Sequence, residues 1–168
     1  VASGSDVPVM TSLFNDVKGE VLGLSHESKI YRLSCADGRI TCELKGSVSS
    51  LLEKEEVNSV CIDRKGRLWL NTTLGRILRS DETMHKFENV SLDNEIDDCT
   101  VLGLLSDKNS VWIITNKKVL QYNIDSQTFL HYSTVDDNIM VDVFRYKAIS
   151  LDGWGGLYVG GHRGFIHI

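Results

Sequence analysis

Basic side chains recur in short polar turns at separate places along this chain of 168 residues. Three such turns are Thr73–Arg76, Asn116–Lys118 and His162–Gly164, and a fourth, His26–Lys29, ends in a lysine. The candidate binding residues in them are Arg76, Lys117, Lys118, His162 and Arg163. An arginine can hold a carboxylate or sulfate through two parallel hydrogen bonds, and a lysine adds a point charge. If these turns converge, they could bind an acidic ligand such as an acidic sugar.

Acidic segments between the predicted strands offer a competing explanation for the basic turns. Their carboxylates are Glu53, Glu55 and Glu56; Asp93, Glu95, Asp97 and Asp98; and Asp136 and Asp137. Local ion pairs with these groups would occupy the basic side chains without any ligand. Exposed turns are also commonly charged, and surface ion pairs of this kind contribute little to stability. The sequence leaves both interpretations open.

Paired carboxylates raise the separate question of catalysis. A glycosidase needs two of them at a defined separation, and Asp97–Asp98 and Asp136–Asp137 are neighbours in predicted loops. The chain contains no Gly-x-Ser-x-Gly elbow, phosphate-binding loop or histidine-rich metal motif. Asp16, Asp63 and Asp152 recur at one position of a repeat, which indicates a structural role. We therefore predict a chain that is not an enzyme and has no cofactor or metal site.

Large side chains follow the same repeat. Leu22, Trp69, Trp112 and Tyr158 each lie in the middle of a predicted strand, which is typical of core packing between sheets rather than of sugar stacking. Trp154 differs, because it lies in the glycine-rich turn Asp152–Gly156. We expect its indole to be partly exposed. It is an interface candidate that could contact a neighbouring domain, or it could fold back onto its own sheet.

The repeat that carries these residues is clearest between Val57 and Arg79. A strand over Val57–Ile62 enters the turn Asp63–Gly66, a second strand carries Trp69, and a third follows Gly75. Aspartate at the first turn position can accept hydrogen bonds from the following backbone, and glycine tolerates the left-handed conformation that ends the turn. From Leu22 to Tyr158 the aligned positions are 47, 43 and 46 residues apart. A period near 45 with three or four strands is typical of propeller blades.

We therefore predict an all-β fold, a β-propeller segment of about four blades built from four-stranded antiparallel sheets. The whole chain, 1–168, is expected to be a single propeller fragment. Its blades are predicted at about 7–46, 55–90, 99–133 and 146–168, with an incomplete last blade of three strands.

These repeats resemble the two-component regulator propeller repeat. The motif Leu-Trp-Ile-Gly-Thr is approached by Leu68–Thr72 and Val111–Thr115, and Leu157–Phe165 looks like the variant of a last blade. The resemblance implies part of the periplasmic sensor region of a hybrid two-component histidine kinase. Many such regions respond to products of polysaccharide breakdown, so a glycan ligand and neighbouring domains of the parent chain are the partners it implies. The alternative is an architectural or protein-interaction propeller without a small-molecule ligand.

Composition and charge narrow the class of partner. The net charge of −5 disfavours nucleic acid, and no apolar run approaches the ~20 residues of a membrane helix. Cys35, Cys42, Cys61 and Cys99 form no metal-binding spacing. Cys61 is expected to be a small buried apolar residue, and a disulfide stays possible.

The incomplete last blade leads to a prediction about assembly. The six residues before Val7 are too few and too polar to supply a closing strand. The chain could close as a tight ring, or it could form an open arc with apolar faces uncovered at both ends. Repeat proteins need each such face covered by a neighbour. We therefore expect a homodimer related by a two-fold axis.

Overall fold

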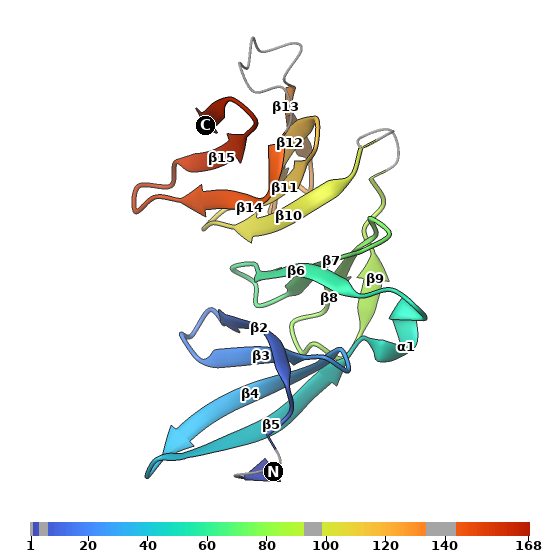
Figure 1. Ribbon diagram of the computed structural model, residues 1–168, viewed down its shortest axis with the longest axis vertical. Coiled ribbons are helices and arrows are strands. Elements are labelled where there is room, and N and C mark those ends of the chain that lie inside the picture. Colours follow the sequence, from blue (N-terminus) through green and yellow to red (C-terminus); the bar gives the residue numbers. More distant parts are fainter. Residues whose placement is uncertain (1, 4–6, 93–98, 134–143) are drawn as a thin grey trace. The chain divides into compact units, whose positions relative to one another are not determined.

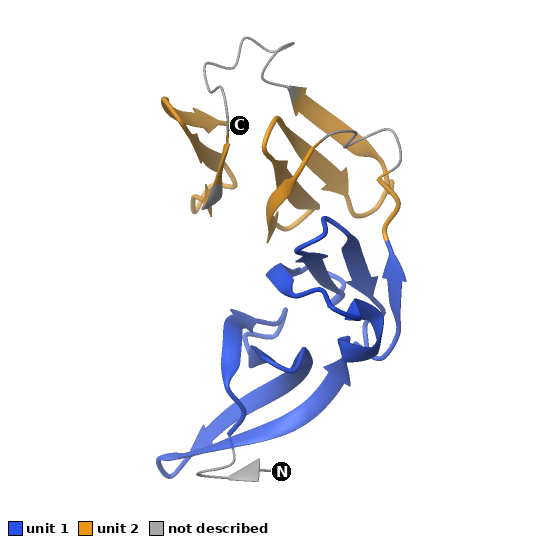
Figure 2. Cartoon of the chain, turned by 45° about the vertical axis from the view of Figure 1, so that its right-hand side comes forward, with its two compact units in different colours: residues 1–89 blue, residues 90–168 orange. Residues whose placement is uncertain are grey.

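The computed structural model describes residues 2–3, 7–92, 99–133 and 144–168. The chain divides into two compact units, unit 1 over residues 1–89 and unit 2 over residues 90–168 (Figure 2). Sheets of antiparallel strands make up both units (Figure 1). The all-β prediction is therefore confirmed.

Unit 1 contains two sheets. The first has the order β1-β5-β4-β3-β2, and its strands are β1 (Ala2–Ser3), β2 (Met10–Asn15), β3 (Val21–Ser25), β4 (Lys29–Ala36) and β5 (Arg39–Ser47). The second has the order β6-β7-β8-β9, from β6 (Val57–Ile62), β7 (Leu68–Thr72), β8 (Ile77–Ser80) and β9 (Phe87–Asn89). Apart from β1, each strand pairs with its neighbours in sequence, as a β-meander does.

Unit 2 repeats this arrangement. Its first sheet runs in the order β10-β11-β12-β13, from β10 (Val101–Ser106), β11 (Ser110–Thr115), β12 (Lys118–Asn123) and β13 (Phe129–Ser133). Its second sheet has three strands among the described residues, β14 (Phe144–Leu151), β15 (Leu157–Gly161) and β16 (Gly164–His167). Among the strands, β6 matches its predicted range at both ends.

Each unit has its own core between its two sheets. In unit 1, Leu22, Leu24 and Ile30 from the first sheet pack with Leu68, Leu70 and Leu78 from the second. In unit 2, Trp112, Ile114 and Val119 pack with Phe144, Leu157 and Val159. Residues two positions apart in one strand, such as Leu22 and Leu24 or Leu157 and Val159, therefore face the same core, as the period of two requires.

The segment between β5 and β6 corrects a prediction. The predicted blades end at 46 and begin again at 55 with no element expected between them, but β5 continues to Ser47 and a short helix, α1 (Ser49–Leu52), follows it. Val48 and Leu52 lie within the core of unit 1 and are at most 2% exposed. The helical turn forms because it buries these two apolar side chains, which the acidic composition of the segment obscures.

The first strand lies on the edge of its own sheet. Ala2 and Ser3 pair with Cys42 and Thr41 of β5, so β1 adds a fifth strand to the first sheet of unit 1. The expectation that the residues before Val7 give no closing strand to the last sheet agrees with this pairing.

Candidate ligand-binding site

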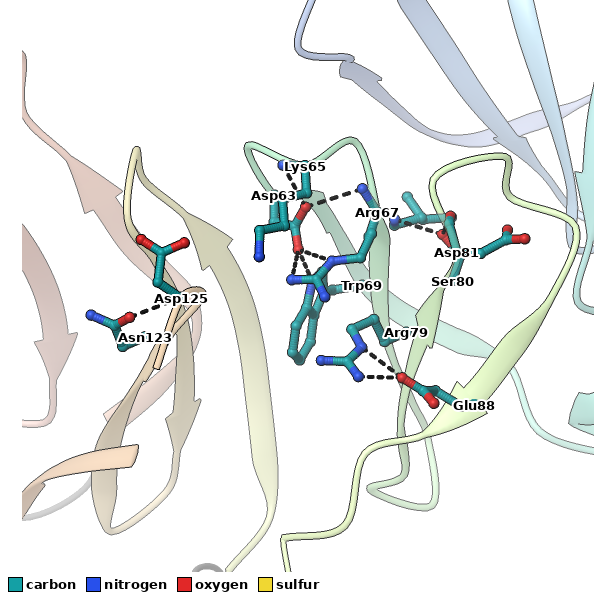
Figure 3. A network of polar contacts seen from close by, with 11 residues as sticks. Asp63, Lys65, Arg67, Trp69, Arg79, Ser80, Asp81, Glu88, Asn123 and Asp125 are labelled. Carbon is teal, nitrogen blue, oxygen red and sulfur yellow. Dashed lines mark hydrogen bonds and ion pairs between the residues drawn. The ribbon is translucent and has the colours of Figure 1, made fainter. Parts of the chain in front are cut away.

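The buried carboxylate of Asp63 organises the turn between β6 and β7 (Figure 3). Its Oδ1 accepts hydrogen bonds from the backbone N–H groups of Lys65 at 2.9 Å and Arg67 at 3.1 Å. Its Oδ2 accepts the indole N–H of Trp69 at 2.9 Å and the Arg67 Nε–H at 2.7 Å. Every lone-pair direction of this carboxylate is thus used to fix the turn and the core tryptophan. The structural role predicted for Asp63 is confirmed.

The Trp69 ring also has a cation over its face. The guanidinium carbon of Arg79 lies 5.3 Å from the ring centroid, within the range of a cation–π contact. Arg79 in turn donates hydrogen bonds from two nitrogens to the carboxylate of Glu88 on β9, one of them from Nε at 2.9 Å (Figure 3). One chain of contacts thus links the turn, the core and the outer strand of this sheet.

The same arrangement recurs in unit 2, at a residue that sequence reasoning missed. Asp107 accepts the Trp112 indole N–H at 2.7 Å through Oδ2 and the backbone N–H groups of Asn109 and Ser110 at 2.7 Å through Oδ1. Its turn is shorter than in the other copies of the repeat and lacks their glycine. The Asp-x-x-Gly pattern that marks the other turn aspartates therefore does not include Asp107. The signal that could have found it is the short interval between an aspartate and a tryptophan.

The repeated large residues divide into two groups. Leu22, Trp69 and Trp112 are at most 4% exposed, so core packing is confirmed for them. Tyr158 is half-buried, and its ring stacks on His167 with centroids 4.4 Å apart. The Trp69 and Trp112 rings are buried, and His167 covers one face of the Tyr158 ring, so this set of residues does not favour sugar stacking.

Arg76 lies in the turn before β8, where the structure gives it local partners. Its Nη2 lies 2.6 Å from Oε1 of Glu55 and donates to the backbone carbonyl of Leu51 at 2.8 Å. Glu55 is one of the acidic residues expected to compete with a ligand. For Arg76 the structure therefore favours local ion pairing.

This pair predicts a pH dependence. The hydrogen bond from Arg76 holds the pKa of the Glu55 carboxyl below its ordinary value of 4.5. A lowered folded-state pKa stabilises the fold above the unfolded pKa, and this contribution is lost as the pH falls through the lowered value. We expect Arg76→Ala to lower the melting temperature at about pH 7, and the difference to shrink below about pH 4.5. Thermal denaturation monitored by circular dichroism across this range checks it, and a difference independent of pH would contradict it.

The remaining basic candidates all belong to unit 2 and lie toward one end of it. Lys117 is in the β11–β12 turn and Lys118 is the first residue of β12, while His162 and Arg163 are in the β15–β16 turn. The carbonyl of Asn116 accepts the N–H of Phe144 at 3.4 Å, and Phe144 pairs with Gly161. Phe144 therefore bonds to the β11–β12 turn and pairs with the residue just before the β15–β16 turn, which links the two turns through the backbone. Lys117, His162 and Arg163 are exposed there, and Lys118 is half-buried.

Unit 1 has a cleft at the ends of its strands that lie opposite the β7–β8 turn with Arg76. It has a volume of about 480 Å³ and lies between the β2–β3, β6–β7 and β8–β9 turns. Lys18, Arg32, Lys45 and Lys65 line it, with Asp16 and Glu82. Arg32 is already paired with Glu20 at 2.9 Å, and Lys45 with Glu43 at 3.0 Å. Internal pairing thus offsets much of the positive charge of this cleft.

Unit 2 has a corresponding cleft of about 420 Å³ between the β10–β11 and β14–β15 turns. Trp154 lies on its rim and is 96% exposed, so the ring does not fold back onto its own sheet. Its turn is fixed by Asp152, whose Oδ1 accepts the backbone N–H groups of Trp154 and Gly156, each at 2.8 Å. These bonds, the one from Gly156 first, lower the pKa of the Asp152 carboxyl. A contact between Trp154 and a neighbouring domain stays a prediction.

Several further predictions concern cysteines, metals and carboxylates. No disulfide joins the four cysteines, each of which belongs to a described segment, and Cys61 is buried as expected. Among the described residues no group of three or more His, Cys, Asp or Glu side chains could hold a metal ion, and no helix is long and apolar enough to span a membrane. The carboxylates over 93–98 and 136–137 lie outside the described residues.

Comparison with known proteins gives a fold but no family. No family model and no curated protein matches the chain. Among solved structures, the extracellular domain of BT4673 from B. thetaiotaomicron, described as a hybrid two component system, matches with a TM-score of 0.62 and 18% identity over 95% of this chain. YCF48 bound to D1 peptide matches with a TM-score of 0.64 and 21% identity over 95% of this chain. The fold is that of a β-propeller segment.

This propeller segment spans only part of the chains that it matches. It covers 20% of the BT4673 chain and 50% of the YCF48 chain. A second structure of YCF48, from Cyanidioschyzon merolae, matches with a TM-score of 0.60 and 13% identity, and 49% of that chain is covered. Identities this low establish the common architecture of the blades and leave function to be argued from this chain's own residues.

Proposed function

We propose that this propeller segment belongs to the ligand-recognising sensor region of a hybrid two-component histidine kinase, and that it binds an acidic, polysaccharide-derived ligand without transforming it. The region would lie in the periplasm, with the neighbouring domains of the parent chain as further partners. The repeat motifs and the similarity to the extracellular domain of BT4673 support this proposal. Signal transmission would require that the ligand bind two arrangements of the region with different affinities.

The observation that carries the proposal is the placement of the two basic turns of unit 2. Backbone pairing through Phe144 brings the turn with Lys117 and Lys118 and the turn with His162 and Arg163 toward the same end of the unit. Exposed guanidinium and ammonium groups on neighbouring turns suit a carboxylate or sulfate. The aspartates Asp63, Asp107 and Asp152, by contrast, are committed to hydrogen bonds that fix turns. Exposed basic groups can bind an anion, whereas these aspartates are already hydrogen-bonded, and this combination favours recognition over hydrolysis.

Thermal denaturation with defined oligosaccharides tests this function. Oligogalacturonate and a sulfated oligosaccharide should raise the melting temperature, because a ligand that binds only the folded state stabilises it by mass action. Each kcal/mol corresponds to about 2–4 °C for a chain of this size. The variant Lys117→Ala/Arg163→Ala should lose the shift, whereas the control Lys86→Ala, an exposed lysine of unit 1, should keep it. An equal shift in both variants, or no shift with either acidic sugar, would contradict the proposal.

A protein-interaction role is the second candidate, favoured by the outer face of the first sheet of unit 1. Leu13, Val21 and Leu44 are 65%, 41% and 57% exposed. Residues that pair across strands lie on the same face of a sheet, and the row Leu13, Gly23, Tyr31 and Leu44 is paired in this way. Val21 lies two residues from Gly23 on the same strand, so it shares this face. YCF48, which shares the fold, is bound to D1 peptide in its structure.

We propose that this face forms the predicted homodimer, since an uncovered apolar sheet face favours association. Light scattering after size exclusion, over a dilution series, should give a dimer for the wild type and a monomer for Leu13→Asp/Leu44→Asp. A wild-type monomer at every concentration would overturn the dimer.

A further inference from the structure

The cleft of unit 2 presents a different chemistry from the basic turns. At 96% exposure, Trp154 is more exposed than any other large apolar side chain in the described part of the chain. It lies at the opposite ends of the strands from Lys117 and Arg163, because β11 begins at Ser110 beside the cleft and ends at Thr115 beside the basic turns. A ligand bound at one place would therefore not occupy the other.

The turn that carries Trp154 is ordered although its ring is exposed. Asp152 accepts two backbone N–H groups across the turn, and Gly155 adopts a φ of +95°, which a residue with a side chain rarely does. Both sequence neighbours of Trp154 are glycines, so no adjacent side chain covers the indole. A flat aromatic surface on a fixed turn binds at a low entropic cost, since little besides one side chain needs to be ordered.

The wall facing this turn includes neutral hydrogen-bonding groups that are already positioned, beside the charged residues Asp107 and Lys108. The amide nitrogen of Gln121 donates to Ser110 Oγ at 2.9 Å, and the hydroxyl of Tyr132 donates to Gln121 Oε1 at 3.3 Å. These bonds fix the amide plane and leave the second N–H of Gln121 available for another acceptor. Asn109 and Lys108 lie on the same lining.

We propose that this cleft binds a neutral sugar ring, with the apolar C–H face of a pyranose stacked on Trp154 and its hydroxyls bonded to Gln121 and Asn109. The negative face of an aromatic ring attracts the weakly positive C–H groups, and hydroxyls can both donate to and accept from amides. The volume of about 420 Å³ is in the range of small-molecule sites.

Other ligand classes fit the lining less well. A cationic ligand would be attracted by the exposed indole, but Lys108 opposes it. The two carboxylates of the lining, Asp107 and Asp152, already accept N–H groups that fix their own turns. An apolar peptide segment would need a wide apolar surface, whereas the aliphatic contribution to this lining comes from Leu151 alone. A rigid aromatic face beside amide and hydroxyl groups thus points to a carbohydrate.

Isothermal titration calorimetry with cellohexaose, xylohexaose and mannohexaose tests the proposal. At least one of these neutral oligosaccharides should bind the wild-type chain, and Trp154→Ala should weaken its binding by about tenfold or more. Trp154→Phe should retain part of the affinity, because a smaller aromatic face remains. Phe165→Ala removes a ring of unit 2 that is 67% exposed and lies outside the cleft, so this control should bind as the wild type does.

Fluorescence gives a second measurement that separates stacking from a change in folding. The emission of Trp154 should shift to shorter wavelength when a sugar covers the indole, and Trp154→Phe should lose this shift while keeping the wild-type melting temperature. Unchanged affinity in Trp154→Ala, or no binding of any of the three sugars, would overturn the proposal. Burial of Trp154 only in a dimer or against an added protein domain would overturn it in favour of the predicted docking contact. The neutral probes keep this outcome distinct from the test of the basic turns with acidic sugars.

Discussion

Replacement of Asp63 by alanine is expected to destabilise unit 1 by about 3 kcal/mol. The substitution removes one carboxylate and leaves four groups without this acceptor: the buried indole N–H of Trp69, the guanidinium of Arg67, and the backbone N–H groups of Lys65 and Arg67. Arg67 is only 14% exposed, so water compensates poorly for the lost ion pair. A large loss follows because the Trp69 indole and most of the Arg67 side chain stay buried after the carboxylate is gone.

Urea denaturation followed by circular dichroism measures this effect against a matched control. Asp16 is the corresponding residue of the β2–β3 turn, and its Oδ1 accepts the N–H groups of Lys18 and Glu20, each at 2.8 Å. Leu22 occupies the repeat position of Trp69, so Asp16 accepts no hydrogen bond from an indole. Asp16→Ala should cost only about 1 kcal/mol. Equal losses in the two variants would show that the turn bonds alone account for the role of Asp63.

Replacement of Gly46 by alanine is expected to destabilise unit 1 by about 2–3 kcal/mol. A Cβ at this position would lie 2.1 Å from the backbone carbonyl oxygen of Met84, in the turn between β8 and β9. The register of β4 and β5 slips at this point, where Ile30 pairs with Gly46 but Tyr31 pairs with Leu44. A backbone atom cannot move aside as a flexible side chain can, so β5 would have to shift away from the second sheet.

The control for Gly46 is Gly153, where an added Cβ would meet nothing within 4 Å. Gly153→Ala should change the free energy of unfolding by at most about 0.5 kcal/mol, as surface substitutions do. Urea denaturation of both variants decides the matter. A stability of Gly46→Ala within 0.5 kcal/mol of the wild type, on the same scale, would show that the two sheets of unit 1 can separate locally without cost.

The strands could be predicted because each depends on local patterns. The aspartate and glycine of the β6–β7 turn set the register on both sides, and the apolar run that follows them marks β7, all of whose residues are buried. Helix α1 could not be found in this way, because four residues show no helical period and their burial depends on the core that they cover. Asp107 was missed for a related reason, since its shorter turn breaks the alignment while preserving the contact.

The candidate sites were less accessible to sequence reasoning. The ion pair of Arg76 with Glu55 joins residues 21 positions apart, and the choice between a ligand and a local partner depends on that distance. The exposure of Trp154 was predicted from its glycine neighbours. Its cleft was not, because Gln121 and Asn109 come from strands and turns of another sheet, and their approach is a property of packing.

The order of strands within each sheet has a consequence for how the chain folds. In three of the four sheets, every strand pairs only with the one before or after it in sequence. Loops to be closed are therefore short, and the entropy lost before the first stabilising contact forms is small. Each sheet can gain structure soon after its own residues are available, while β1 must wait for β5. Hydrogen exchange should accordingly reveal separate cooperative groups of amides that follow the sheets, with Ala2 and Ser3 the last to gain protection.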